Sequence, residues 1–453
     1  MTRGLGTGGH PVGMSGVVAT LSGMDREPSG TTPRRPGGPD VTAVPVTVRE
    51  AMRRALAVVR PLDALDVAPA DARGCLLAAD VIAEAPLPPG DVAALDGYAV
   101  RAEDTHLPGG ADEDGAQILR VVAQVSPGDS DPSAVVRGSA VLVASGVPLP
   151  RGADAVVPTA ATDRGRVRVA IRAQVRPGSG VRAAGRDLSA GAVAVPAGTR
   201  LAARHLALLA AAGVPRVRVH PRARVVVLPV GDEIVEQGAH VPAGHVRDAA
   251  GAALLAALAE ACADAYRVPA VSDGRAALRD ALEDQLVRAD VVVVTGGLSG
   301  ASHDTVAAVL AELGAVETLD LATEPPLRIA VGTLQGSTPV FALPGHPVRA
   351  ALAFETVVLP AMRTISGATR LGRPTVSALV QGRWDSPAGR REFVCAAVEG
   401  RGTEADPYRA TPITPAAEIS LHALARADAL LVVPEDVTAV RDGDRLGCVL
   451  FEG

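Results

Sequence analysis

Short apolar runs alternate with longer amphipathic stretches through residues 216–368 of this chain. The runs are rich in β-branched residues, and each ends in a loop that carries Gly or Pro, as in VVVLPVGDE at 225–233. This pattern predicts strands at 225–230, 266–271, 290–295 and 339–343 and helices at 249–263, 274–287, 304–313 and 348–365. Strands that alternate with helices of this length indicate right-handed crossovers and a parallel sheet.

The pattern changes on both sides of this α/β segment. Residues 1–44 are rich in Gly, Pro, Ser and Thr without an apolar period, which predicts a disordered tail. A helix is predicted near Thr47, with Glu50 in the capping-box position, and another at 201–213, closed by Gly213. Residues 69–173 read as a small β-rich module, and the chain from about 370 reads as a second one, a barrel or a sandwich.

Composition narrows the class of protein. The chain has 453 residues, enough for about three domains, and 48% of them are hydrophobic. Its net charge of -6 does not favour a nucleic-acid partner, and no apolar run approaches the roughly 18 residues of a membrane span. No secretory pattern occurs at 1–24, and the four cysteines are far apart, so we expect a cytoplasmic protein with reduced thiols.

The chain contains neither Lys nor Asn. A P-loop lysine, a Schiff-base lysine and any other catalytic lysine are therefore excluded, and Arg must supply the positive charge.

Three of the strand-ending loops hold the candidate chemistry: VGDE at 230–233, TGGLSG at 295–300 and LPGHP at 343–347. In an open parallel sheet such loops gather at the carboxyl ends of the strands, where ligands bind. Backbone N–H groups of a Gly-rich loop at a helix start hold anions. The loops therefore predict a phosphate-bearing ligand with carboxylates beside it.

Each loop also has a plainer interpretation. Asp232 is the candidate Mg²⁺ ligand or general base, but it could equally be a surface carboxylate beside Glu233. The glycines of TGGLSG permit close backbone approach, yet an ordinary turn followed by a helix cap would explain the same sequence. A lone loop histidine is more often solvated than catalytic. The candidate ligand-binding residues of these two loops are Thr295, Gly296, Gly297, Ser299, Asp304, Pro344, Gly345, His346 and Pro347.

A further motif lies outside the α/β segment. ALDGYAVR at 94–101, read alone, predicts a turn at Asp96-Gly97 and a packed Tyr98. It resembles the signature of the molybdopterin molybdenumtransferase family (MoeA type, similar to the gephyrin E domain). Other stretches resemble that family in the same order along almost the whole chain after residue 45: PLPRGADAVV, VRAAGRDLSAGAVAVPAGTRL, GDE, TGGLSGASHD, LPGHPVRA and LARADALLVVPED.

The resemblance implies a multi-domain fold of the α/β plus β class. Its parts would be a discontinuous helical and linker domain (45–68 and 174–215) and an inserted β-rich domain (69–173). A parallel-sheet α/β pterin-binding domain (MogA/MoaB-like, 216–368) and a C-terminal β-barrel (369–453) would follow. It also implies a homodimer in which the β module of one subunit faces the α/β domain of the other.

The implied reaction is the insertion of molybdate into adenylylated molybdopterin with release of AMP, assisted by Mg²⁺. Asp232, Asp96 and Asp273 stand where the family keeps acidic site residues, and Asp232 would hold the metal. A molybdopterin adenylyltransferase and molybdoenzymes are the implied partners.

The chain departs from the family pattern at several of these places. The family has Lys-Pro-Gly-Lys-Pro where this chain has TEPPLRIAVG at 323–332, so both lysines are missing and Arg328 is the available cation. Arg186 replaces a Glu, His346 and Ala250 replace Asn, and Cys395 replaces an Arg. Three hypotheses stay open: an active molybdenumtransferase, a family member that binds pterin or nucleotide with impaired catalysis, and a partner-binding scaffold.

Overall fold

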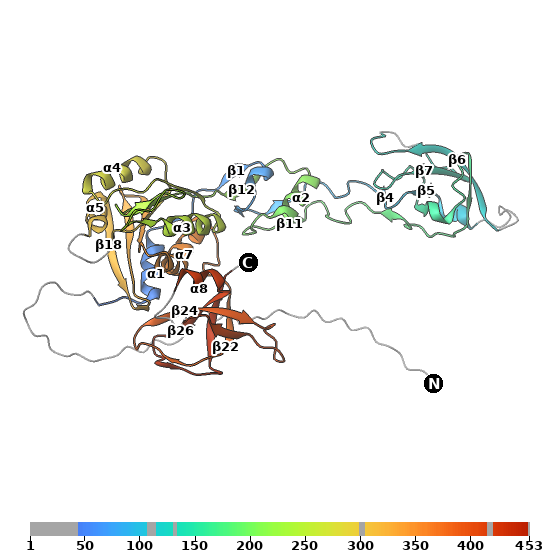
Figure 1. Cartoon of the computed structure of the whole chain (residues 1–453). Helices are drawn as coiled ribbons and strands as arrows, with labels where there is room; N and C mark the ends of the chain where they lie inside the picture. The colour runs from blue at the N-terminus through green and yellow to red at the C-terminus, as the bar shows by residue number, and fades with distance from the viewer. Residues whose placement is uncertain (1–43, 107–114, 130–133, 299–303, 415–419, 452–453) are drawn as a thin grey trace, which may run out of the picture. The chain divides into compact units, whose positions relative to one another are not determined.

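The structure, a computed structural model, describes residues 44–106, 115–129, 134–298, 304–414 and 420–451 (Figure 1). The expected N-terminal tail up to residue 43 and the candidate residue Ser299 lie outside these ranges. Among the described residues, no helix has the length and apolarity needed to cross a membrane.

A six-stranded sheet is the centre of the α/β segment. Its order is β16 (Asp264–Arg267), β13 (Arg224–Pro229), β17 (Val291–Thr295), β21 (Thr338–Leu343), β20 (Leu327–Leu334) and β18 (Gly314–Leu321). The first four strands run parallel, as predicted, whereas β20 and β18 form an antiparallel hairpin at the edge. The strand pattern of 314–334 was not part of the prediction, so the sheet is larger than expected.

Helices cover both faces of this sheet (Figure 1). Val226 and Leu228 of β13 pack with α4 (Arg275–Leu286) and α5 (Thr305–Leu313). Val225 and Val227 of the same strand belong to the other face, with α1 (Val48–Ala57), α3 (Ala249–Glu260), α6 (Pro347–Ala353) and α7 (Leu359–Ile365). All four strand side chains are fully buried, and each contributes about 1.5–3 kcal/mol to stability.

The helix expected at 348–365 is continuous but irregular. Between α6 and α7 the residues Phe354–Val358 form a π-helical segment. Pro360 follows at the second position of α7, and a proline has no N–H to give to the preceding turn. The wider π turn is one way for a helix to pass such a residue.

The β-rich regions form separate sheets. A five-stranded sheet has the order β8 (Ala155–Pro158), β5 (Gly97–Val100), β7 (Ser139–Val143), β6 (Gln117–Val125) and β9 (Arg168–Ile171). A smaller sheet joins β1 (Leu65–Val67), β12 (Val217–His220) and β2 (Leu76–Leu77), with α2 (Ala203–Ala211) beside it. Two-stranded pairs join β3 (Val81–Ile82) to β11 (Val193–Val195) and β4 (Val92–Ala93) to β10 (Val181–Arg182).

The C-terminal region closes into a five-stranded barrel, as the resemblance implied. Its strands are β24 (Arg391–Glu399), β25 (Arg409–Pro412), β22 (Thr375–Val380), β28 (Arg445–Leu450) and β26 (Ala429–Val433), and a β24–β26 pairing completes the ring. The short strand β19 (Thr323–Glu324) adds to the outside of β24 in parallel. The remaining elements are α8 (Leu421–Arg426) and the pair β23 (Trp384–Asp385) and β27 (Ala439–Val440).

Candidate functional site

The ends of the four parallel strands form one continuous group of turns at the carboxyl edge of the sheet. The Val230 N–H donates to the Thr295 carbonyl at 2.8 Å, and the Gly231 N–H donates to the Val271 carbonyl at 3.0 Å. The Gly296 N–H donates to the Leu343 carbonyl at 3.1 Å. The loops VGDE, TGGLSG and LPGHP therefore start side by side, as their strand positions predict.

Glycine is required where two of these turns meet. Gly296 has a φ of 89°, and a Cβ added there would lie 2.2 Å from the Val230 carbonyl oxygen. A Cβ on Gly345 would lie 3.2 Å from the Gly296 Cα, so the LPGHP turn rests directly on the TGG turn. A side chain at Gly296 would push the two turns apart.

Two of the expected acidic residues come together at the ends of neighbouring strands. The Asp232 N–H donates to Asp273 Oδ2 at 3.4 Å, which brings the turn after β13 to the turn before α4. The Asp232 side chain is exposed. The adjacent Glu233 folds back instead, with its carboxylate 2.6 Å from the position of a Cβ on Gly231. Both side chains are exposed, and the two carboxylates point to different places at this turn.

The other side of the edge is the start of α5. Asp304 caps this helix as predicted, because its Oδ1 accepts from the Ala307 N–H at 3.3 Å. Arg328 Nη2 lies 3.7 Å from Asp304 Oδ2, and Arg328 Nη1 lies 3.2 Å from Asp320 Oδ2. Buried Arg328 Nε and Asp304 Oδ2 have no hydrogen-bond partner among the described residues. A cation and an acceptor therefore stand with hydrogen-bonding capacity left at this helix start.

The remaining loop candidates occupy less open positions or carry no side-chain contact. Thr295 is the last residue of β17 and is only 1% exposed. His346 is exposed and precedes Pro347, the first residue of α6, without a capping hydrogen bond from its side chain. Pro344 and Gly345 complete the turn.

Asp96 lies in the β-rich module, in the turn before β5. Its Oδ1 accepts from the Ser145 N–H at 2.7 Å. The neighbouring Tyr98 is 1% exposed, and its hydroxyl donates to the Gly165 carbonyl at 3.1 Å. Among the described residues, no hydrogen bond or ion pair joins Asp96 or Arg186 to the carboxyl edge of the same chain.

Comparison with known proteins gives this arrangement its family. Three family models match: "MoeA N-terminal region (domain I and II)" over residues 46–213, "Probable molybdopterin binding domain" over 226–364 and "MoeA C-terminal region (domain IV)" over 377–451. Molybdopterin molybdenumtransferase 1 of Mycobacterium tuberculosis is 37% identical over 416 residues, which cover 88% of this chain and 97% of that protein. The chain belongs to the molybdopterin molybdenumtransferase family.

Other relatives agree. Molybdopterin molybdenumtransferase 2 of the same bacterium is 33% identical over 406 residues, covering 88% of this chain and 98% of that protein. The crystal structure of a molybdopterin biosynthesis MoeA protein from Pyrococcus horikosii has 29% sequence identity and a TM-score of 0.71, covering 90% of this chain and 100% of its own. The resemblance drawn from the motifs is confirmed, and family membership implies a part in molybdenum cofactor biosynthesis.

The Mg²⁺ expected in this molybdenumtransferase fits the carboxyl edge only if the substrate supplies some of its ligands. No three His, Cys, Asp or Glu side chains gather to form a metal cage within the described ranges. Mg²⁺ is usually held by one or two carboxylates together with waters and substrate phosphates. Asp232 and Asp273, whose turns meet through the Asp232 N–H, are two carboxylates that suit such a shared site.

The sequence pattern did not place two arginines at this edge, although it named Arg328 as the available cation. Arg328 reaches the carboxyl edge because β20 runs antiparallel, so the first residues of that strand lie there. Arg267, at the end of β16, contacts Asp248 and Glu236 near Asp232. Cys395, by contrast, is fully buried in β24, and burial raises the pKa of its thiol to about 11, so it acts as an apolar side chain.

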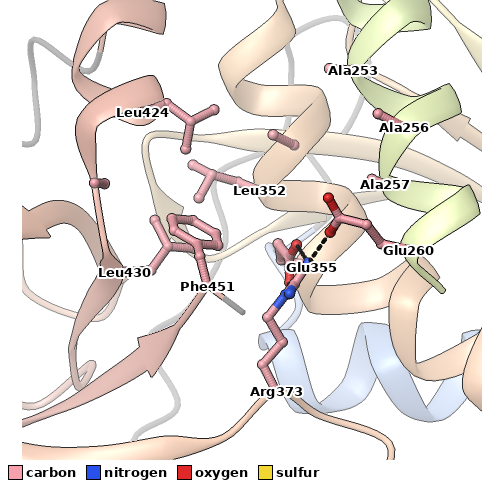
Figure 2. A pocket seen from close by; sticks show the side chains of 12 residues that line it. Ala253, Ala256, Ala257, Glu260, Leu352, Glu355, Arg373, Leu424, Leu430 and Phe451 are labelled. Atoms are coloured by element: carbon pink, nitrogen blue, oxygen red, sulfur yellow. Dashed lines mark hydrogen bonds and ion pairs between the residues drawn. The ribbon is translucent and has the colours of Figure 1, made fainter. Parts of the chain in front are cut away.

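A hollow lies away from the loops, lined by α3, α6 and the C-terminal region (Figure 2). Alanine and leucine side chains form most of its wall. Its charged side chains satisfy one another: Arg373 Nε lies 2.7 Å from Glu355 Oε2, and Arg373 Nη2 lies 3.3 Å from Glu260 Oε2. The Arg373 side chain is 6% exposed. This hollow therefore offers less to an anionic substrate than the carboxyl edge does.

Proposed function

We propose that this chain inserts molybdate into adenylylated molybdopterin and releases AMP, with Mg²⁺ as the metal. The observation that supports this most is that carboxylates able to bind a cation and groups able to bind phosphate lie at the same edge of one sheet. Asp232 and Asp273 lie at the ends of β13 and β16, and the TGG turn, the α5 start and Arg328 lie on the other side.

The side chains and turns would divide the work. The N–H groups of the TGG turn and of the first turn of α5 would bind phosphate oxygens, because a helix start attracts anions. Arg328 would offset the Asp304 charge there and donate its free Nε–H. Asp232 and Asp273 would hold the divalent cation. When bound, that cation neutralises charge on the pyrophosphate as the bond to AMP breaks.

Asp96 would complete the site from a second subunit. Within one chain it has no described contact with the carboxyl edge, and the resemblance implies a homodimer that brings these parts together across subunits. A mixed dimer of Asp96→Ala and Asp232→Asn subunits would keep one intact site. We expect such mixtures to recover activity that neither variant has alone, and no recovery would place Asp96 elsewhere.

The direct test is AMP release from adenylylated molybdopterin, with molybdate and Mg²⁺ added together and separately. Release that requires both would support the proposal. Isothermal titration with molybdopterin and with its adenylate measures binding independently. A chain that binds neither compound would be a scaffold rather than an enzyme of this reaction.

One observation favours the impaired family member as a second candidate. The segment at 323–332, where the family carries two lysines, has none here, and its Glu324 Oε2 lies 3.2 Å from Arg390 Nη1. Arg328, the remaining cation, is already in contact with Asp304 and Asp320. Tight binding of the adenylate without AMP release would establish this second candidate.

We keep the domain limits given by the resemblance in this proposal, except at residues 45–58, and a molybdopterin adenylyltransferase and molybdoenzymes remain the proposed partners. α1 packs in the core of the α/β sheet, whereas β1, β2 and β12 share a sheet of their own. Residues 45–58 would therefore stay with the α/β domain if the chain were divided by proteolysis.

A further inference from the structure

The chain does not pass directly from β13 to α3. Residues 231–248, called here the 231–248 lobe, leave the sheet and return as the parallel pair β14 (Ile234–Val235) and β15 (Val246–Arg247). Asp232 is the second residue of this lobe. Backbone bonds close its base, where the Ile234 N–H donates to the Gly231 carbonyl at 3.2 Å and the Val246 N–H to the Glu233 carbonyl at 2.9 Å. Beyond the base, backbone bonds form two local turns, from the Ala239 N–H to the Glu236 carbonyl and from the His245 N–H to the Pro242 carbonyl.

One arginine on the neighbouring strand contacts the lobe at two places, at Glu236 and at its last residue, Asp248. Arg267, the last residue of β16, places Nη1 and Nη2 at 3.0 and 3.1 Å from the two Glu236 oxygens. Its Nε donates to Asp248 Oδ2 at 2.5 Å. Glu236 also accepts from the Ala270 N–H at 3.2 Å, so it is fixed to the chain that follows β16. This set, Arg267 with Glu236 and Asp248, is called the Arg267 clamp.

The clamp is sheltered on one side. The Asp248 side chain is 4% exposed and that of Arg267 17%, whereas Glu236 is 51% exposed. Asp248 also caps α3, because its Oδ1 accepts from the Gly251 N–H at 2.7 Å. Burial by itself lowers the pKa of Arg267, but the hydrogen bonds to Glu236 and Asp248 raise it overall, so the guanidinium stays charged. Bidentate bonds of this kind fix geometry as well as charge.

We propose that Arg267 is a positioning residue that holds the 231–248 lobe and thereby sets where the Asp232 carboxylate lies. The inference deepens the proposed function, on which the role of Asp232 rests. Arg267 itself does not touch the substrate. While the clamp is closed the lobe is already ordered, so a ligand that binds Asp232 does not lose affinity to the entropy cost of ordering it.

Hydrogen exchange of the ligand-free protein tests the clamp without any substrate. In Arg267→Gln we expect the amides of residues 234–247 to exchange about tenfold faster, while those of β13 and β17 do not change. Arg279→Gln is the matched control, because Arg279, on α4, also bridges two carboxylates, those of Glu283 at 3.2 Å and Glu312 at 3.3 Å. Equal exchange of the lobe in both variants would overturn the proposal.

Two further variants guard against a general loss of folding. Glu236→Gln leaves the Arg267–Asp248 pair in place and should loosen the lobe alone. Arg267→Lys can serve only one carboxylate and should give an intermediate exchange rate. If Glu236→Gln exchanges as the wild type does, the lobe is not held by this pair and the proposal fails.

A cation titration separates the clamp from the proposed function. In Arg267→Gln the Mg²⁺ concentration for half-maximal AMP release should rise about tenfold, with the rate at saturating Mg²⁺ within about threefold of wild type. A loss of maximal rate with unchanged Mg²⁺ dependence would contradict positioning of Asp232. Faster lobe exchange in a protein whose wild type releases no AMP would keep the clamp and refute the proposed function instead.

Discussion

Aspartates at the amino edge of the central sheet are paired with arginines, whereas within the described ranges Asp232 and Asp273 at its carboxyl edge are not. At the amino edge, Asp290 precedes β17 and accepts from the Arg224 N–H at 2.8 Å and from Arg224 Nη2 at 2.7 Å. Asp264, at the start of β16, lies 3.1 Å from Arg222. At the carboxyl edge, neither Asp232 nor Asp273 forms an ion pair with another described residue, and Asp232 is exposed.

The same strands carry both edges, so the difference does not come from the fold alone. A carboxylate paired on both oxygens adds to stability and has little capacity left for a ligand. A carboxylate left open adds little to stability and can bind a metal or a phosphate-bound cation. Stability and function should therefore respond to substitutions at opposite edges, and four experiments can break or sharpen this separation.

The largest expected effect is on activity, at the carboxyl edge. Asp232→Asn should lower AMP release by about a hundredfold or more, because the amide cannot replace the charge of a metal-binding carboxylate. Its unfolding free energy should stay within about 0.5 kcal/mol of wild type, as for other exposed sites. Full activity in this variant would remove Asp232 from the mechanism.

Gly296→Ala should lower both stability and ligand binding, because Gly296 lies where two turns meet. The added Cβ would lie 2.2 Å from the Val230 carbonyl oxygen, in a residue whose φ is 89°. We expect a loss of about 2 kcal/mol in unfolding free energy, measured by urea denaturation, together with weaker adenylate binding. Gly336→Ala is the control, since its φ is 82° but nothing lies within 4 Å of an added Cβ. Equal losses in both variants would show that backbone conformation, not the close approach, is what matters.

At the amino edge, Asp290→Asn should cost about 1–2 kcal/mol of stability and leave AMP release unchanged. Burial raises the pKa of Asp290, but hydrogen bonds from Arg224 outweigh it and lower the pKa overall. The stabilisation is therefore complete above the unfolded pKa of about 3.9 and is lost as pH falls through the lower folded value. Urea midpoints between about pH 5 and 2 should fall more steeply in wild type than in Asp290→Asn. Parallel curves would contradict this role.

The smallest expected effect concerns a charge at neither edge. Arg186 is exposed and stands where the family has Glu. If it approaches the site of a second subunit, Arg186→Glu should raise AMP release by a few-fold, about 1 kcal/mol or less in barrier. Activity identical to wild type would place Arg186 outside the site.

The sequence predicted the strands with continuous β-branched runs, the three loops that follow them and the capping role of Asp304, because each depends on local pattern. It did not indicate the β20–β18 hairpin, in which Arg328 is brought to the carboxyl edge by chain direction. Nor did it indicate the Arg267 clamp, whose partners Glu236 and Asp248 stand 31 and 19 positions away. Such contacts depend on how strand ends meet in space, which periodicity does not encode.

The short strand β19 adds a backbone link between the α/β segment and the barrel, whose Phe393 and Leu430 already pack into the core of the α/β segment. Thr323 and Glu324 pair with Arg391 and Glu392 of the C-terminal barrel, and Arg328 follows only a few residues later at the carboxyl edge. A ligand that draws Arg328 toward its phosphates would therefore transmit force to the barrel wall through a very short stretch of backbone. Substitutions inside the barrel, remote from any substrate atom, should then change the rate of nucleotide release.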